Sequence, residues 1–256
     1  MELFPFLKSV FSPSSGYILP KKDRINGISN RVVLCCDKSA YISEQYRSAA
    51  ARLKYLAKDK ESFAVIVTSA IPGEGKSTTA ANLAVALAES TTDPVILIDG
   101  DLRKPTIHKL FGLNIENGLL QVINNPTVPV EPEKVAGLNI LTAGTSGEKQ
   151  IDPTKLSCTR ELILDLKKHY KYVIVDCPPV QSVADTQIIG QSCDGALFVV
   201  RARSTSSKLV KSSIELLRGS GVTPIGTLLT RSISEVDMYS YWTNKDYRRY
   251  FEKKYA

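Results

Sequence analysis

The sequence has few residues that could bind zinc or serve in a histidine-dependent active site. It contains two histidines, and its five cysteines form no Cys-x-x-Cys pair. The sequence therefore has almost no residues with which to form a histidine-containing zinc site or a Ser-His-Asp triad. The odd number of cysteines also argues against a disulfide framework, so the pattern favours a reducing cytoplasm.

Long apolar runs are missing as well. No stretch approaches the roughly 18 consecutive apolar residues of a membrane-spanning helix, so we expect a soluble polypeptide. The apolar start of the chain is short and lacks both a basic first segment and a small-residue cleavage site, which argues against a secretory signal. The formal net charge of +7 is spread along the chain. We interpret it as a mildly basic, solvated surface and expect no nucleic-acid partner.

Composition divides the 256 residues into three predicted segments. Residues 1–38 mix prolines, glycines and polar residues with one strand-like run at 31–36, which indicates a loosely ordered N-terminal arm. Residues 39–233 alternate strand-like and helical patterns, which predicts a single α/β domain with a mostly parallel sheet and helices on both faces. Residues 234–256 form a basic tail rich in tyrosine.

The periodicity of apolar residues places the elements of the central domain. Strands are predicted from residue 63 up to Ala70 and at 95–101, 139–142, 172–176, 196–200 and 225–229. The longer predicted helices cover residues 41–58, 77–89, 159–169, 184–191 and 207–218.

Residues 63–77, FAVIVTSAIPGEGKS, predict a strand, a phosphate-binding loop and the start of a helix. They match the P-loop pattern Gly-x-x-x-x-Gly-Lys-Ser/Thr except that Ala70 replaces the first glycine. Glycines let the backbone approach a triphosphate, the lysine reaches the β- and γ-phosphates, and the serine hydroxyl coordinates Mg²⁺. A plain glycine-containing turn is the alternative. We assign ATP binding to Pro72, Gly73, Glu74, Gly75, Lys76, Ser77 and Thr78.

Carboxylates follow two of the buried strands. Asp99 and Asp101 end the second predicted strand, and Asp176 ends the strand at 172–176. Ligands of open parallel sheets bind beside the carboxyl ends of the strands, so these acids are expected on the same side as Lys76.

Tyrosines are concentrated at the C-terminus, where residues 239–256 hold five of the chain's 11, interleaved with lysines and arginines. One interpretation is an amphipathic helix that packs on the domain, and another is a basic-aromatic segment at a membrane surface. The third is a cluster of phosphate acceptors, which composition alone does not separate from the other two. The five are Tyr239, Tyr241, Tyr247, Tyr250 and Tyr255.

Taken together, these motifs resemble the bacterial tyrosine kinases of capsule and exopolysaccharide synthesis, relatives of the septum-site and plasmid-partition P-loop ATPases. The resemblance covers residues 41–256, and its most specific element is the run DGDLRKP at 99–105. It implies that Lys76 and Ser77 bind phosphate and Mg²⁺ and that Asp176 holds Mg²⁺ through water. Asp99 and Asp101 would bind the metal or accept the proton of the incoming tyrosine.

Two positions depart from the family pattern. Family members often carry Glu-x-x-Arg-x-x-Arg for subunit contacts in a ring; Glu44 and Arg47 match it, but Ala50 replaces the second arginine. We therefore expect a homo-oligomer, but this motif does not predict that the subunits form a ring. Thr230 replaces an asparagine that tends to read adenine in the family, which leaves base recognition to other groups.

The resemblance implies an ATP-dependent autokinase that phosphorylates the tail of a neighbouring subunit and regulates polysaccharide polymerisation or export. It also implies a separate membrane-embedded activator of the polysaccharide co-polymerase type, recruitment to the inner face of the plasma membrane, and a tyrosine phosphatase. The main alternative is a non-kinase P-loop ATPase switch that controls dimerisation and membrane or DNA binding. A scaffold that only binds nucleotide is a third hypothesis.

Overall fold

A computed structural model describes residues 8–10, 24–25, 27–38, 40–125, 131–145, 156 and 158–231. The predicted tail, with its five tyrosines, and most of the predicted N-terminal arm lie outside the described residues. Over the described part, no helix is both long and apolar enough to cross a membrane.

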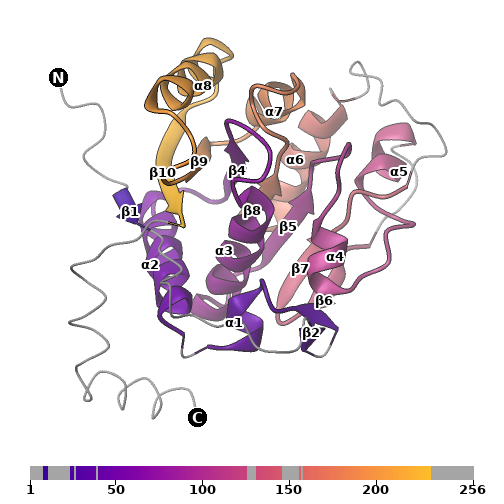
Figure 1. The fold of residues 1–256 in the computed structure, drawn as a ribbon. Helices are drawn as coiled ribbons and strands as arrows, with labels where there is room; N and C mark the ends of the chain where they lie inside the picture. Colours follow the sequence, from indigo (N-terminus) through magenta and orange to yellow (C-terminus); the bar gives the residue numbers. More distant parts are fainter. Residues whose placement is uncertain are drawn as a thin grey trace, which may run out of the picture.

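An eight-stranded sheet forms the centre of the molecule (Figure 1). Its order is β1-β10-β9-β4-β8-β5-β7-β6, and every neighbouring pair is parallel except β6 with β7. A separate antiparallel pair joins β2 (Arg24–Ile25) and β3 (Ile28–Ser29). The strands of the large sheet are β1 (Lys8–Val10), β4 (Phe63–Ser69), β5 (Val95–Asp99), β6 (Glu133–Val135), β7 (Leu138–Leu141), β8 (Tyr172–Asp176), β9 (Gly195–Arg201) and β10 (Pro224–Thr230).

Helices cover both faces of the sheet, and the alternation along β4 shows why. Val65 and Val67 face one buried cluster, to which α1 to α4 contribute, whereas Ala64 and Ile66 face a second cluster, to which α5 to α8 contribute. Strands buried on both faces become continuous apolar runs, which is what made them recognisable in the sequence. The helices are α1 (Val33–Cys36), α2 (Tyr41–Leu56), α3 (Lys76–Ser90), α4 (Ile107–Phe111), α5 (Leu119–Asn124), α6 (Cys158–His169), α7 (Asp185–Gly190) and α8 (Ser207–Gly219).

The predicted α/β fold is confirmed, but the strand predicted at residues 31–36 is wrong. Residues 33–36 form helix α1, and Val32 and Leu34 are fully buried. Asn82 of α3 holds this segment, because its side-chain amide donates to the Arg31 carbonyl at 2.8 Å and its oxygen accepts the Leu34 N–H at 3.4 Å. These tertiary contacts override the strand preference of the β-branched residues.

Candidate nucleotide and phosphoryl-transfer site

The loop between β4 and α3 has the backbone that a phosphate cradle needs. Gly73 and Gly75 adopt φ values of 83° and 94°, which only glycine reaches readily, and Gly75 is the N-cap of α3. Ala70 is not among the residues with positive φ, so the first glycine of the pattern has no conformational role there. The first turn of the 15-residue helix α3 directs unpaired N–H groups toward the loop, a favourable place for phosphate oxygens.

Lys76 lies among the predicted carboxylates. Its Nζ is 2.8 Å from Asp101 Oδ2, 3.7 Å from Asp176 Oδ1 and 3.2 Å from the Ser77 hydroxyl. Burial alone would lower the pKa of Lys76, but Asp176 and Asp101 outweigh it and raise that pKa. The lysine is therefore a buried cation held at the C-terminal edge of the sheet.

The two acids that follow β5 have different contacts. Asp99 Oδ2 accepts the N–H groups of Thr106 and Ile107, both at 2.9 Å, at the start of α4. Asp101 accepts the Lys104 N–H at 3.0 Å through Oδ1 and binds Lys76 through Oδ2. The structure thus brings both acids to the site, one oriented by α4 and the other by the lysine.

Asp99 and Asp176 are direct neighbours across the β5–β8 pair. Burial, followed by repulsion from Asp176, raises the pKa of Asp99. Burial also raises the pKa of Asp176, although Lys76 opposes the shift. Two adjacent carboxyl groups in such a position are favoured as charged groups only when a cation joins them.

The donor set fits Mg²⁺. Asp99 Oδ1 is buried without a hydrogen-bond partner. Both oxygens of the buried Asp176 lack a short hydrogen bond, and the groups beside them are Lys76, 3.7 Å from Oδ1, and the Ser77 hydroxyl on α3. Such hard oxygen ligands suit Mg²⁺, which takes one or two carboxylates and completes its shell with water and phosphate oxygens. Among the described residues, no group of three or more acidic, histidine or cysteine side chains is placed to hold a metal ion.

Two polar contacts at the site were not anticipated from the sequence. The Glu74 side chain makes its hydrogen bonds to protein groups, including the Arg201 N–H at 3.1 Å. Arg103 binds Asp185 with Nε at 2.9 Å and Nη2 at 3.3 Å, and the Asp185 side chain is only 3% exposed. Glu74 could have been singled out from the sequence, because an acid inside a phosphate-binding loop is unusual. No local pattern marks Asp185.

The two positions that depart from the family pattern, Ala50 and Thr230, are both held by contacts within the chain. Arg47 pairs with Glu44 in the same helix and with Glu89 of α3 at 3.5 Å, while Ala50 is fully buried. The Thr230 hydroxyl donates to the Glu74 carbonyl at 2.8 Å, so the end of β10 is attached to the phosphate loop.

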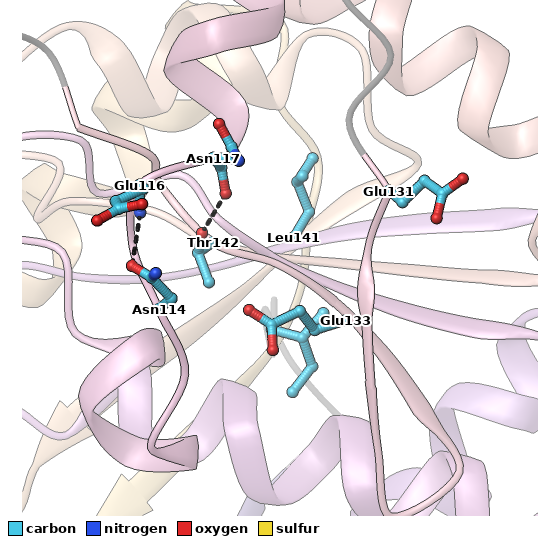
Figure 2. Close-up of a pocket in the computed structure, with 8 residues that line it drawn as sticks. Asn114, Glu116, Asn117, Glu131, Glu133, Leu141 and Thr142 are labelled. Atoms are coloured by element: carbon cyan, nitrogen blue, oxygen red, sulfur yellow. Dashed lines mark hydrogen bonds between the residues drawn. The ribbon is translucent and has the colours of Figure 1, made fainter.

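A separate polar pocket of about 170 Å³ lies next to the carboxyl end of β7 (Figure 2). The Thr142 hydroxyl donates to the Asn117 carbonyl at 2.9 Å there, and the Glu116 N–H donates to Asn114 Oδ1 at 3.1 Å. Leu141 pairs with Ile98, the residue before Asp99, so the pocket is one strand away from Asp99. Its lining residues are Asn114, Glu116, Asn117, Glu131, Glu133, Ile140, Leu141 and Thr142.

Residues 61–237 match the ParA family model, described as NUBPL iron-transfer P-loop NTPase. Tyrosine-protein kinase YwqD of Bacillus subtilis is 33% identical over 230 residues, which are 88% of this chain and 97% of that protein. Putative tyrosine-protein kinase CapB of Staphylococcus aureus is 30% identical over 209 residues, 80% of this chain and 91% of its own length.

Solved structures agree with these relatives. The VpsO kinase domain is 30% identical with a TM-score of 0.63, and the match covers 76% of this chain and all of that one. The kinase domain of Escherichia coli ETK shares the fold with a TM-score of 0.76 at 24% identity, over 91% of this chain and 92% of that chain. This chain belongs to the bacterial tyrosine-protein kinases, nucleotide-binding enzymes with the ParA-type P-loop NTPase fold.

Proposed function

We propose that this kinase transfers the γ-phosphoryl group of ATP to tyrosines in the C-terminal segment of a second copy of the same chain. The observation that carries the proposal is the buried contact between Lys76 and Asp101 beside the buried carboxylates of Asp99 and Asp176. Asp101 is thus an acid at the phosphate site in addition to the two proposed for the metal. The tyrosines of the segment 234–256 supply the acceptors.

The proposed roles follow from the contacts. Lys76 leaves Asp101 for the β- and γ-phosphates, residues 72–78 provide the backbone cradle, and Asp99, Asp176 and Ser77 hold Mg²⁺. When bound, Mg²⁺ neutralises charge on the phosphates.

Asp101, released from Lys76, accepts the proton of the tyrosine hydroxyl. The phenolic oxygen forms a bond to the γ-phosphorus as the bond to the bridging oxygen breaks, and ADP leaves. Because tyrosine has a pKa near 10, the carboxylate acts mainly by orienting the hydroxyl and accepting its proton late.

The biological context is part of the same proposal. The kinase regulates polymerisation or export of a capsular or exopolysaccharide, a separate membrane protein activates it at the inner face of the plasma membrane, and a tyrosine phosphatase resets it. The family resemblance supports this context. A solved chimera, CapA2B2, is 29% identical to this chain with a TM-score of 0.68 over 80% of this chain and 91% of that chain. The division into an arm (1–38), a kinase domain (39–233) and a tail (234–256) belongs to the proposal as well.

Mass spectrometry after incubation with ATP and Mg²⁺ tests the proposal. Phosphate is expected on one or more tail tyrosines, none after Lys76→Met, and none when all five tyrosines are changed to phenylalanine. The phenylalanine variant should still bind ATP, which separates loss of the acceptor from loss of the site. Unmodified tyrosines in the wild-type chain, even with the cytoplasmic segment of an activator present, would refute the proposal.

Deleting residues 239–256 distinguishes a kinase from an ATPase switch. A switch that transfers phosphate to water keeps its ATP turnover and its biological output without the tail. The autokinase instead loses its acceptors, so its ADP production is expected to drop with the deletion.

A further inference from the structure

Glu74 is a buried acid in the middle of the phosphate loop, with only 2% of the residue exposed. Its Oε2 accepts the Ile71 N–H at 2.9 Å within the loop. Its Oε1 accepts the Arg201 N–H at 3.1 Å, at the end of β9, and the Thr205 hydroxyl at 2.6 Å in the segment before α8. One carboxylate thus connects the loop to a segment about 130 residues further along the chain.

The Glu74 carboxylate places a negative charge inside the phosphate-binding loop. It lies in a loop whose neighbouring residues are placed to receive phosphate anions, and the described residues show no salt bridge between Glu74 and a lysine or arginine. Burying a carboxylate is costly unless hydrogen bonds replace its water. Three donors do so here, of which one belongs to the last residue of β9 and one to the segment between β9 and α8.

The loop needs support because of its glycines. Gly73 and Gly75 have many accessible backbone conformations, so an isolated loop of this sequence would sample many shapes. Thr230 makes a second attachment, since its hydroxyl donates to the Glu74 carbonyl at 2.8 Å. Holding a loop in its bound shape before the ligand arrives increases affinity.

We propose that Glu74 is a positioning residue that keeps the phosphate loop in its nucleotide-receiving shape by attaching it to the ends of β9 and β10. It acts through the loop backbone and does not contact the reacting atoms. The inference rests on the proposed assignment of residues 72–78 to the ATP phosphates.

Binding of a fluorescent ATP analogue with Mg²⁺ tests the role of Glu74. In Glu74→Gln the amide nitrogen must face one of the N–H donors, so the dissociation constant should rise about tenfold, the loss typical of a hydrogen bond to a charged group. Thr205→Val removes one donor and should raise it about threefold. Because both variants break one network, the double variant should bind no more weakly than Glu74→Gln.

Matched controls separate positioning from folding. Glu161→Gln removes an exposed acid of α6 and should leave affinity unchanged. Thr205→Val removes one of the three donors to the buried carboxylate and should lower the melting temperature slightly. The variant should nevertheless be fully folded at the temperature of the binding assay while its affinity falls, a combination that a merely structural role does not give. Tight wild-type binding with equal affinity in Glu74→Gln and Thr205→Val overturns the inference alone, whereas no binding by the wild-type chain overturns the proposed phosphate site.

Discussion

At the scale of the residue, Asp99 is an acid placed where its charged form is unfavourable. It is fully buried, one of its oxygens has two hydrogen bonds and the other has none. Burial and the neighbouring Asp176 raise its pKa, while Asp101 adds repulsion and the N–H groups of α4 oppose the shift. In the ligand-free protein the charged form is therefore unfavourable.

This predicts a dependence of stability on pH. The folded state binds a proton on Asp99 that the unfolded chain releases near pH 4, so stability falls as the pH rises from that value toward the raised pKa. Asp99→Asn should remove the contribution of Asp99 and leave that of Asp176, because the asparagine oxygen still accepts both N–H groups while no charge is buried at position 99. We expect the variant to melt higher than wild type at pH 8, by an amount that shrinks toward pH 4.

Thermal melts of ligand-free protein between pH 4 and pH 8.5 measure the effect of Asp99→Asn. The same variant should lose about a hundredfold or more of phosphotyrosine formation, since it removes a charge from the proposed site. Asp165→Asn, an exposed position on α6, serves as control. A variant that melts below wild type throughout this range would show that the charged form is not destabilising.

The sequence predicted which residues form the site, but it did not predict the contacts that hold them. The loop and the acidic strand ends belong to local patterns, which is why Lys76, Asp99 and Asp176 could be predicted and are found together. The contacts of Glu74 with Arg201 and of Arg103 with Asp185 join residues 127 and 82 positions apart, and no local pattern carries such information. The proposed roles of the site residues stay predictions.

At the scale of the element, the quality of the prediction followed the strength of the apolar pattern. Buried strands such as β4 and β8 appear as continuous apolar runs, and their ends were placed within a residue or two. Strand β6 was missed because its three residues are exposed or only partly buried and show no such run. Helix α1 was missed because contacts with Asn82 decide its shape.

The packing of helix α2 restricts which residues of the family's Glu-x-x-Arg-x-x-Arg motif this chain can accommodate. Ala50 is fully buried in the core cluster to which α2 and α3 both contribute. Introducing the family's arginine by Ala50→Arg should not restore ring contacts, because the side chain would enter the core. Overpacking and a buried charge should lower the free energy of unfolding by about 3 kcal/mol or more.

Ala51→Arg provides the matched control for this helix, because residue 51 is exposed. Its melting temperature and its elution in size-exclusion chromatography should match those of the wild type. If Ala50→Arg instead melted like wild type and eluted as a larger assembly, the helix would be able to turn position 50 outward for subunit contacts.

At the scale of the whole molecule, the sheet determines where the tail begins relative to the site. The chain leaves β10, which is separated from β5 by β9, β4 and β8. At about 4.8 Å per strand this distance is roughly 19 Å. Tyr239 lies eight residues beyond Arg231, enough chain to reach about 27 Å when extended. Length alone therefore permits a tail to reach its own site, and transfer between two copies needs a direct test.

Mixing two complementary variants provides that test. The Lys76→Met chain keeps its tyrosines but lacks the lysine proposed to bind the ATP phosphates. A chain ending at residue 238 keeps the proposed site but lacks the tail tyrosines. If transfer occurs between copies, the Lys76→Met chain should gain phosphotyrosine at a rate that rises with the concentration of the shortened chain. Lys76→Met incubated alone should stay unlabelled. Lys76→Met with its five tail tyrosines changed to phenylalanine should stay unlabelled even when it is mixed with the shortened chain. Labelling of wild type at a rate per molecule independent of concentration, with no label in the mixture, would instead establish transfer within one chain.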